Sequence, residues 1–111
     1  MDPLTPAVFH ILLALADGER HGYAIMQDVA ASTGDKFRMG PGTLYGTLKR
    51  LLAADLVVEA GERRDPSMND ERRRYYRLTP NGQQAVLVES KRLESLVRIA
   101  RKKCLLGVGA E

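Results

Sequence analysis

Apolar residues recur at helical spacing along most of this 111-residue chain. The first apolar stretch, residues 4–16, predicts a helix that begins near Thr5, with Pro6 in its first turn. Asp17 and Gly18 then form a turn that ends this helix. The chain is therefore expected to open with a helix that buries most of its surface.

Two further helices are predicted before the middle of the chain. One begins at Gly22 and ends at Gly34, a residue suited to the C-terminal cap. Its inner face would hold Tyr23, Ile25, Met26, Val29 and Ala30. The other runs from Pro41 to about Ala54, because leucines recur at intervals of three and four residues. These leucines are Leu44, Leu48, Leu51 and Leu52.

Two strands and a last helix follow. The segments 56–62 and 72–79 are rich in strand-forming residues, and the polar segment 62–71 between them reads as a hairpin loop. Alternation along the second strand predicts that Tyr76 packs inward and that Tyr75 is more exposed. Thr79 and Pro80 are typical of a helix start, and this helix would continue to about Leu106.

The order of these elements predicts the fold. Three helices followed by a two-stranded hairpin form the winged helix-turn-helix plan, which is mainly α with a small β-hairpin. Residues 1–79 would form this domain, and residues 80–111 a long C-terminal dimerisation helix that makes one compact unit with the first helix.

Composition limits the classes of protein. The chain contains no run of 18 apolar residues, so no membrane span is predicted. The N-terminus lacks a signal-peptide layout, so a cytoplasmic location is expected. The single cysteine, Cys104, excludes an intramolecular disulfide. It can be a buried small hydrophobic residue or a reactive or dimer-bridging thiol.

Positive charge is unevenly distributed. Residues 1–35 contain one basic and five acidic residues, whereas residues 36–77 contain ten basic and six acidic ones. This asymmetry is compatible with a polyanionic partner, although basic residues also serve as solvated surface.

The segment "GPGTLYG", residues 40–46, could be read as a phosphate-binding loop. Its spacing matches neither nucleotide-binding motif, and no strand precedes it. A helix N-terminus that approaches DNA phosphates explains it better. The face opposite the leucines is either solvated or a DNA-reading surface, and the order of the elements favours DNA. That face holds Gly42, Thr43, Tyr45, Gly46, Lys49 and Arg50.

The hairpin carries a second group of basic residues. They can protect a sheet edge from aggregation, or they can hold DNA backbone beside the third helix. The second interpretation assigns DNA contact to Arg63, Arg64, Arg72, Arg73 and Arg74, together with Pro41, Gly42, Thr43, Tyr45 and Lys49 in the helix.

Catalytic and metal sites are not predicted. His10 lies within an apolar helix and is expected to be partly buried, whereas His21 precedes a helix and is expected to cap it. No metal-binding, nucleophile or cofactor motif occurs, so neither an enzyme nor a cofactor is expected.

The last helix bears an apolar strip that no later element covers. It would pack partly on the first helix and partly on a second subunit, although packing within one chain is the alternative. The predicted dimer interface comprises Val8, Ile11, Leu12, Leu93, Leu96, Val97, Ala100 and Cys104. A winged-helix module that binds proteins rather than DNA is the rival function.

Three segments together resemble one known family. Residues 21–29 ("HGYAIMQDV"), 40–57 ("GPGTLYGTLKRLLAADLV") and 73–86 ("RRYYRLTPNGQQAV") are similar to the signatures of PadR-type transcriptional regulators. The resemblance spans nearly the whole chain, and the single C-terminal helix resembles the short PadR-like subfamily.

The resemblance implies a homodimeric repressor that binds a palindromic operator in double-stranded DNA. It also implies release by a small aromatic or planar ligand in some members. Two departures stand out: the chain has no tryptophan, so a tryptophan-lined ligand pocket does not transfer, and Gly46 replaces the family's usual proline.

Overall fold

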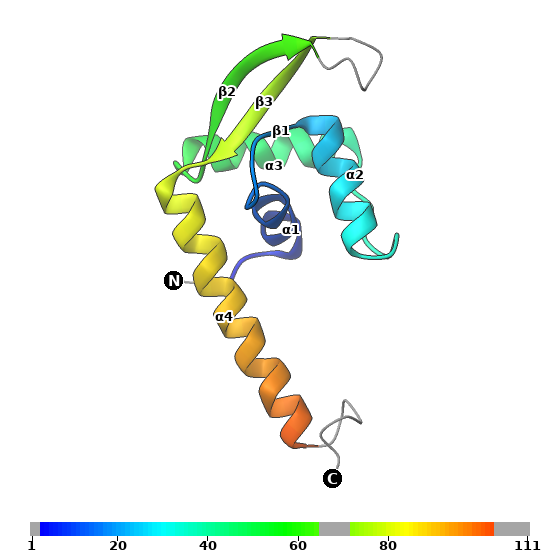
Figure 1. Ribbon diagram of the computed structural model, residues 1–111, viewed down its shortest axis with the longest axis vertical. Coiled ribbons are helices and arrows are strands. Elements are labelled where there is room, and N and C mark those ends of the chain that lie inside the picture. Colours follow the sequence, from blue (N-terminus) through cyan, green and yellow to red (C-terminus); the bar gives the residue numbers. More distant parts are fainter. Residues whose placement is uncertain (1–2, 65–71, 104–111) are drawn as a thin grey trace.

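The computed structural model describes residues 3–64 and 72–103. Its elements are α1 (Pro6–Ala14), β1 (Arg20–His21), α2 (Gly22–Ser32), α3 (Pro41–Ala53), β2 (Val57–Arg64), β3 (Arg72–Leu78) and α4 (Pro80–Lys102). The first three helices pack into a head, the β2–β3 hairpin projects from it, and α4 runs away in the other direction (Figure 1). This is the predicted winged helix-turn-helix arrangement with a long C-terminal helix.

Side chains at the starts of α1 and α2 confirm two predicted boundaries. Thr5 caps α1 by accepting a hydrogen bond from the backbone N–H of Val8 at 3.3 Å. The Nδ1 of His21 accepts from the N–H of Ala24 at 3.1 Å and caps α2, as its place before the helix predicted. Local sequence therefore fixes where these helices begin.

The core lies where the three head helices meet the sheet. The leucine face predicted for α3 is directed inward, as are Ile25 and Val29 of α2, but Tyr23, predicted on the inner face of α2, is 44% exposed. His10 is half-buried, with its ring 4.7 Å from that of Phe37. The fully or almost fully buried residues include Ile11, Leu12, Leu15, Ile25, Val29, Leu44, Leu48, Leu51, Val57 and Tyr76. Burying these side chains supplies the main favourable term for folding.

The sheet has three antiparallel strands in the order β1-β3-β2, one more than the sequence predicted. The additional strand, Arg20–His21, pairs with Tyr75 and Tyr76 of β3 and ties the start of α2 to the hairpin. The predicted hairpin loop was also too long at its first end, because Glu62, Arg63 and Arg64 belong to β2. The rest of that loop lies outside the described residues.

The start of α4 is fixed to the corner between α3 and β2. The Thr79 hydroxyl donates to the Asp55 carbonyl at 2.6 Å and accepts from the Gly82 N–H at 3.0 Å. A β-carbon at Gly82 would collide with the Leu56 carbonyl oxygen, so only glycine permits this approach. These contacts set the direction in which α4 leaves the head.

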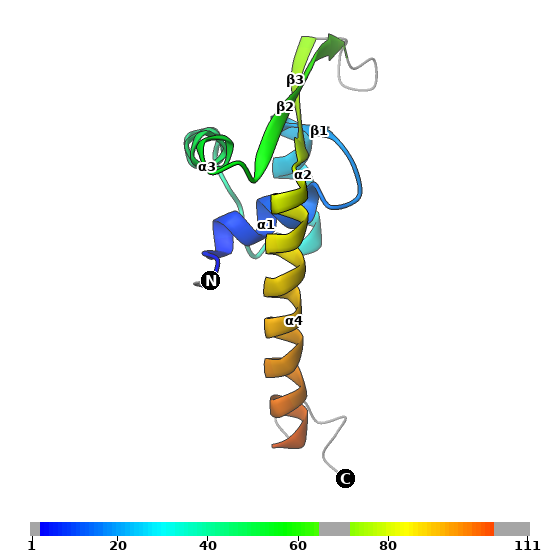
Figure 2. The ribbon, with the colours of Figure 1, turned by 90° about the vertical axis from the view of Figure 1, so that its left-hand side faces the viewer.

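The helix α4 extends well beyond the head (Figure 2). It ends at Lys102, short of the predicted Leu106, with Lys103 at its C-cap. Its buried residues, Gly82, Ala85, Val86 and Glu89, all lie in its first half. No helix in the described part of the chain is long and apolar enough to cross a membrane.

Candidate nucleic-acid interface

One side of α3 is buried and the other faces solvent. Leu44, Leu48 and Leu51 anchor the helix in the core, and this orientation leaves a continuous outer face. The exposed residues on that face are Pro41, Gly42, Thr43, Tyr45, Gly46, Lys49 and Arg50. All five residues assigned to DNA contact in the third helix therefore lie on one accessible surface.

The start of α3 differs from the starts of α1, α2 and α4. Gly40 is its N-cap, and no side chain caps its first turn. A β-carbon at Gly42 would meet no atom within 4 Å, so this end of the helix is open to a ligand. Uncapped N–H groups and the positive end of the helix dipole favour an anion such as a phosphate.

The β2–β3 register divides the hairpin arginines between two faces. Directly opposed residues share a face, and Arg64 opposes Arg72 while Glu62 opposes Arg74. These residues therefore share the face of Tyr76, which is buried in the core. Arg63 and Arg73 oppose each other on the second face, with Tyr75. The five arginines therefore lie on two faces of the hairpin, as the alternation along the second strand predicts for Arg72, Arg73 and Arg74.

Like charges face each other across the end of the hairpin. The cross-strand pairs Arg63–Arg73 and Arg64–Arg72 are unfavourable in isolation, because opposed like charges repel. A polyanion would relieve this repulsion, and so would nearby carboxylates.

On the Tyr76 face, Glu62 of β2 supplies part of this compensation, because its carboxylate lies 3.9 Å from Arg72 of the opposed Arg64–Arg72 pair. Glu59 and Glu62 both contact Arg74, at 3.1 and 3.4 Å, because a bulge at Gly61 brings them to the same face. Gly61 has a φ of 96°, a conformation that glycine adopts without strain. The carboxylates of Glu59 and then Glu62 raise the pKa of Arg74.

Glu19 supplies the compensation on the other face. Its carboxylate forms ion pairs with Arg63 and with Arg77, the latter at 3.9 Å. The Arg63 guanidinium also lies 3.8 Å from the centre of the Tyr75 ring, a cation–π contact. The sequence did not assign a role to Glu19 or Arg77, because they are brought together only by the folded sheet.

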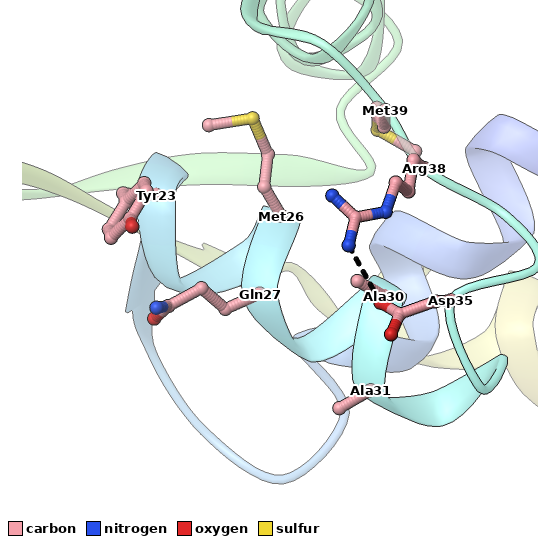
Figure 3. Close-up of a pocket in the computed structure, with 8 residues that line it drawn as sticks. All are labelled: Tyr23, Met26, Gln27, Ala30, Ala31, Asp35, Arg38 and Met39. Atoms are coloured by element: carbon pink, nitrogen blue, oxygen red, sulfur yellow. Dashed lines mark hydrogen bonds and ion pairs between the residues drawn. The ribbon is translucent and has the colours of Figure 1, made fainter.

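Two hollows lie outside the α3 surface. One, of about 500 Å³, lies along α2 and the segment leading to α3, where Arg38 and Asp35 form an ion pair at 3.2 Å (Figure 3). The other, of about 320 Å³, lies between α1 and α4 and is lined by Leu4, Pro6, Phe9, His10, Glu89, Arg92 and Leu93. Within residues 3–64 and 72–103, no cluster of three His, Cys, Asp or Glu side chains could hold a metal ion.

The residues expected at a dimer interface fall into three groups. Ile11 and Leu12 are 0% exposed in the core of their own chain, so their assignment to the interface needs correction. Leu96 and Val97 are exposed by 50% and 42%, and Val8, Leu93 and Ala100 are half-buried. Cys104 lies outside the described residues. Ile99, also 48% exposed on α4, was not included in the predicted interface.

A helix-turn-helix head with an exposed third helix and a basic hairpin defines a winged-helix protein. The family model for the transcriptional regulator PadR-like family matches residues 11–88. The chain therefore belongs to the PadR-like family of transcriptional regulators. Membership of this family makes it a DNA-binding regulator of transcription and not an enzyme.

Individual relatives agree with this assignment. The chain is 40% identical over 89 residues to the transcriptional regulator Rv3488 of Mycobacterium tuberculosis, covering 80% of this chain and 77% of that protein. It is also 43% identical over 74 residues to an uncharacterized 37.1 kDa protein in transposon TN4556 of Streptomyces fradiae. That match covers 67% of this chain but only 19% of the larger protein.

Solved structures share the fold. A PadR family transcription regulator from Clostridium difficile superposes with a TM-score of 0.71 at 21% identity, covering 88% of this chain and 97% of that one. Bacillus subtilis PadR, solved in complex with operator DNA, gives a TM-score of 0.60 at 23% identity, covering 71% of this chain and 43% of that one.

Proposed function

We propose that the protein is a homodimeric repressor that binds a palindromic operator through α3 and the β2–β3 hairpin. The observation that carries this proposal is the pairing of an exposed, uncapped α3 start with a hairpin in which two pairs of arginines oppose each other in register. Both features are explained by a nearby line of phosphates. The complex of the related Bacillus subtilis PadR with operator DNA supports the choice of duplex DNA as the partner.

The residues of α3 would have different tasks. Thr43 and Tyr45, near the helix start, would approach base edges in the major groove, as the second helix of a helix-turn-helix does. Lys49, one turn further on, would contact phosphate. On the hairpin, Arg64, Arg72 and Arg74 share the face toward α3, so they would hold the adjacent backbone. Arg63 and Arg73 would contact it from the opposite face.

The distal half of α4 supports a homodimer. Leu93, Leu96, Val97 and Ala100 recur at helical spacing, and Leu96 and Val97 are exposed by 50% and 42%. A second copy of the chain offers the same strip, as the self-complementary interface of a twofold dimer requires. The two heads would then reach the two half-sites of a palindrome.

A small planar ligand would release the DNA by altering this dimer. The hollow between α1 and α4 adjoins the strip at Leu93, and Phe9, His10 and Arg92 offer ring and cation contacts. Because α1 belongs to the head and α4 to the proposed interface, a ligand here could change the spacing of the heads.

Footprinting tests the proposal. We expect the purified protein to protect an inverted repeat upstream of its own gene, with affinity that falls as salt rises. The repeat should be protected symmetrically, and transcription from that promoter should fall when the protein is added. Absence of salt-sensitive binding to any duplex would instead favour the rival function, a winged helix that binds proteins.

A further inference from the structure

The tyrosine on the proposed DNA-reading surface does not extend freely from α3. Tyr45 is 48% exposed, yet one side of its ring rests on the backbone of Gly22, the first residue of α2. A β-carbon at position 22 would lie 2.7 Å from Tyr45 Cζ and 3.0 Å from Cε1, and closer still to the hydroxyl oxygen. No residue except glycine leaves room for the ring in this position.

The backbone at Gly22 does not itself require glycine. Positive φ angles occur at Gly18, Gly34 and Gly61, but Gly22 is not among them. Glycine is also among the least favourable residues for a helix. Glycine at this position leaves the Tyr45 ring where it is, whereas any β-carbon would displace it.

The contact between Tyr45 and Gly22 lies where α2 is joined to the sheet. His21, immediately before it, caps α2 and meets the ring of Tyr75 edge-on at 5.3 Å between centroids. The same residue pairs with Tyr75 in the sheet, so the start of α2 is tied to the hairpin. Tyr45 of α3 thus rests on the start of α2, next to the point where β1 pairs with β3.

We propose that Gly22 is a positioning residue that holds the Tyr45 phenol in one orientation on the DNA-reading face and so contributes to base discrimination. The proposal rests on the proposed function. With one side of the ring held by Gly22, only the remaining edge and the hydroxyl group are offered to a base pair. A ring without this support would sample other rotamers and would discriminate less between bases.

The test adds a single methyl group in Gly22→Ala. Its probes are a duplex selected by the wild-type protein from a random pool, the same duplex with one half-site base pair changed, and an unrelated duplex. We expect the variant to bind the selected duplex at least tenfold more weakly, with binding to the unrelated duplex within twofold of wild type. In a Tyr45→Ala background, Gly22→Ala should change selected-duplex binding by less than twofold.

A spectroscopic measurement distinguishes positioning from general damage. The chain has four tyrosines, and selective isotope labelling makes the Tyr45 ring observable by NMR. Gly22→Ala should shift its signal, whereas Gly46→Ala, which adds the same methyl group in open space on α3, should shift it far less. An unmoved Tyr45 signal in Gly22→Ala, or unchanged discrimination between the duplexes, would overturn the proposal.

Three further outcomes are informative. If Gly22→Ala does not fold but the double variant with Tyr45→Ala does, the contact itself is confirmed as the reason for glycine. If neither folds, Gly22 serves the packing of the whole head and the proposal fails. A wild-type protein that selects no duplex would instead contradict the proposed function, and the NMR comparison would still report on the contact.

Discussion

Each residue of α3 belongs either to the core or to the outer face, and neighbouring residues in the sequence can lie on opposite sides of the helix. Leu44 is fully buried while Tyr45 is half exposed, and Leu48 is buried while Lys49 is exposed. The 3.6-residue period of the helix produces this division. Substitutions on the outer face can therefore change DNA binding with little effect on folding.

Lys49→Ala tests the outer face directly. We expect operator affinity to fall and the slope of log K against log salt to decrease by about 0.9, the value for one lost phosphate contact. Binding would be measured by fluorescence anisotropy across a salt series. Lys91→Ala, which removes the same charge from the exposed surface of α4, is the matched control. An unchanged slope for Lys49→Ala would remove this residue from the interface.

Gly46→Ala tests the residue at which the chain departs from the family pattern. Its β-carbon would meet no atom within 4 Å, and its position lies inside α3. We expect the free energy of unfolding to rise by about 0.5–1 kcal/mol, because alanine loses less backbone entropy in a helix than glycine. Urea unfolding at fixed protein concentration measures this. A decrease would indicate that Gly46 makes a close contact in the assembled protein.

At the scale of elements, α4 is attached to the head by polar contacts at both ends of its buried half. Thr79 and Gly82 fix its start against Asp55 and Leu56. Further along, the 5% exposed Glu89 receives two hydrogen bonds from Arg92 within α4, at 3.0 and 2.6 Å, and its link to the head is a hydrogen bond with the Leu4 backbone. The direction of α4 relative to α3 is thus set by short-range contacts rather than by the exposed distal half.

The Glu89 contact predicts a pH dependence. Hydrogen bonds from Arg92, and more weakly from the Leu4 backbone, lower the pKa of Glu89 in the folded protein. A lowered folded-state pKa stabilises the fold at neutral pH, and this contribution is lost as pH falls below the usual glutamate value of about 4.3. We expect Glu89→Gln to have a lower melting temperature than wild type at pH 7, with the gap narrowing toward pH 3.

Glu94→Gln provides the comparison for this measurement. Glu94 also pairs with an arginine on α4, Arg98 at 3.4 Å, but both side chains are largely exposed. Exposed pairs contribute little to stability, so this variant should follow the wild-type curve. A Glu89→Gln gap that stayed constant with pH would show that the carboxylate charge is not what stabilises the contact.

At the scale of the whole molecule, the head and the distal half of α4 differ in how much they bury. The head encloses a core, whereas the distal half of α4 contains no buried residue in its described part. The long axis of 53 Å against 29 and 22 Å reflects this projecting helix. An exposed apolar strip of this kind marks an interaction surface.

Leu96→Glu tests whether a second copy covers that strip. A charge buried in an apolar interface is strongly unfavourable, so we expect the protein to shift from dimer to monomer in sedimentation velocity. Operator affinity should fall with it, because the two heads would no longer bind together. Ser95→Glu adds the same charge on the other side of α4 and should leave the dimer intact. A dimer unaffected by Leu96→Glu would place the interface elsewhere.

The sequence alone determined the features that depend on near neighbours in the chain. Helical spacing of leucines identified the buried side of α3, and Thr5, His21 and Thr79 marked the starts of three helices. These signals are readable because helix periodicity and capping involve residues three or four positions apart. The three helices, the hairpin and the long last helix, and with them the winged-helix class, follow from such local patterns.

The tertiary structure decided the contacts between distant residues. Arg63 meets Glu19 across 44 positions, and Tyr45 rests on Gly22 from a different helix. The two-residue strand β1 carried no signal of its own because its pairing partner lies in β3. Ile11 and Leu12 have the same apolar character as an interface residue, and only packing within the chain shows them to be core. Such choices depend on which surfaces meet in space, and that is settled by the packing of the whole fold.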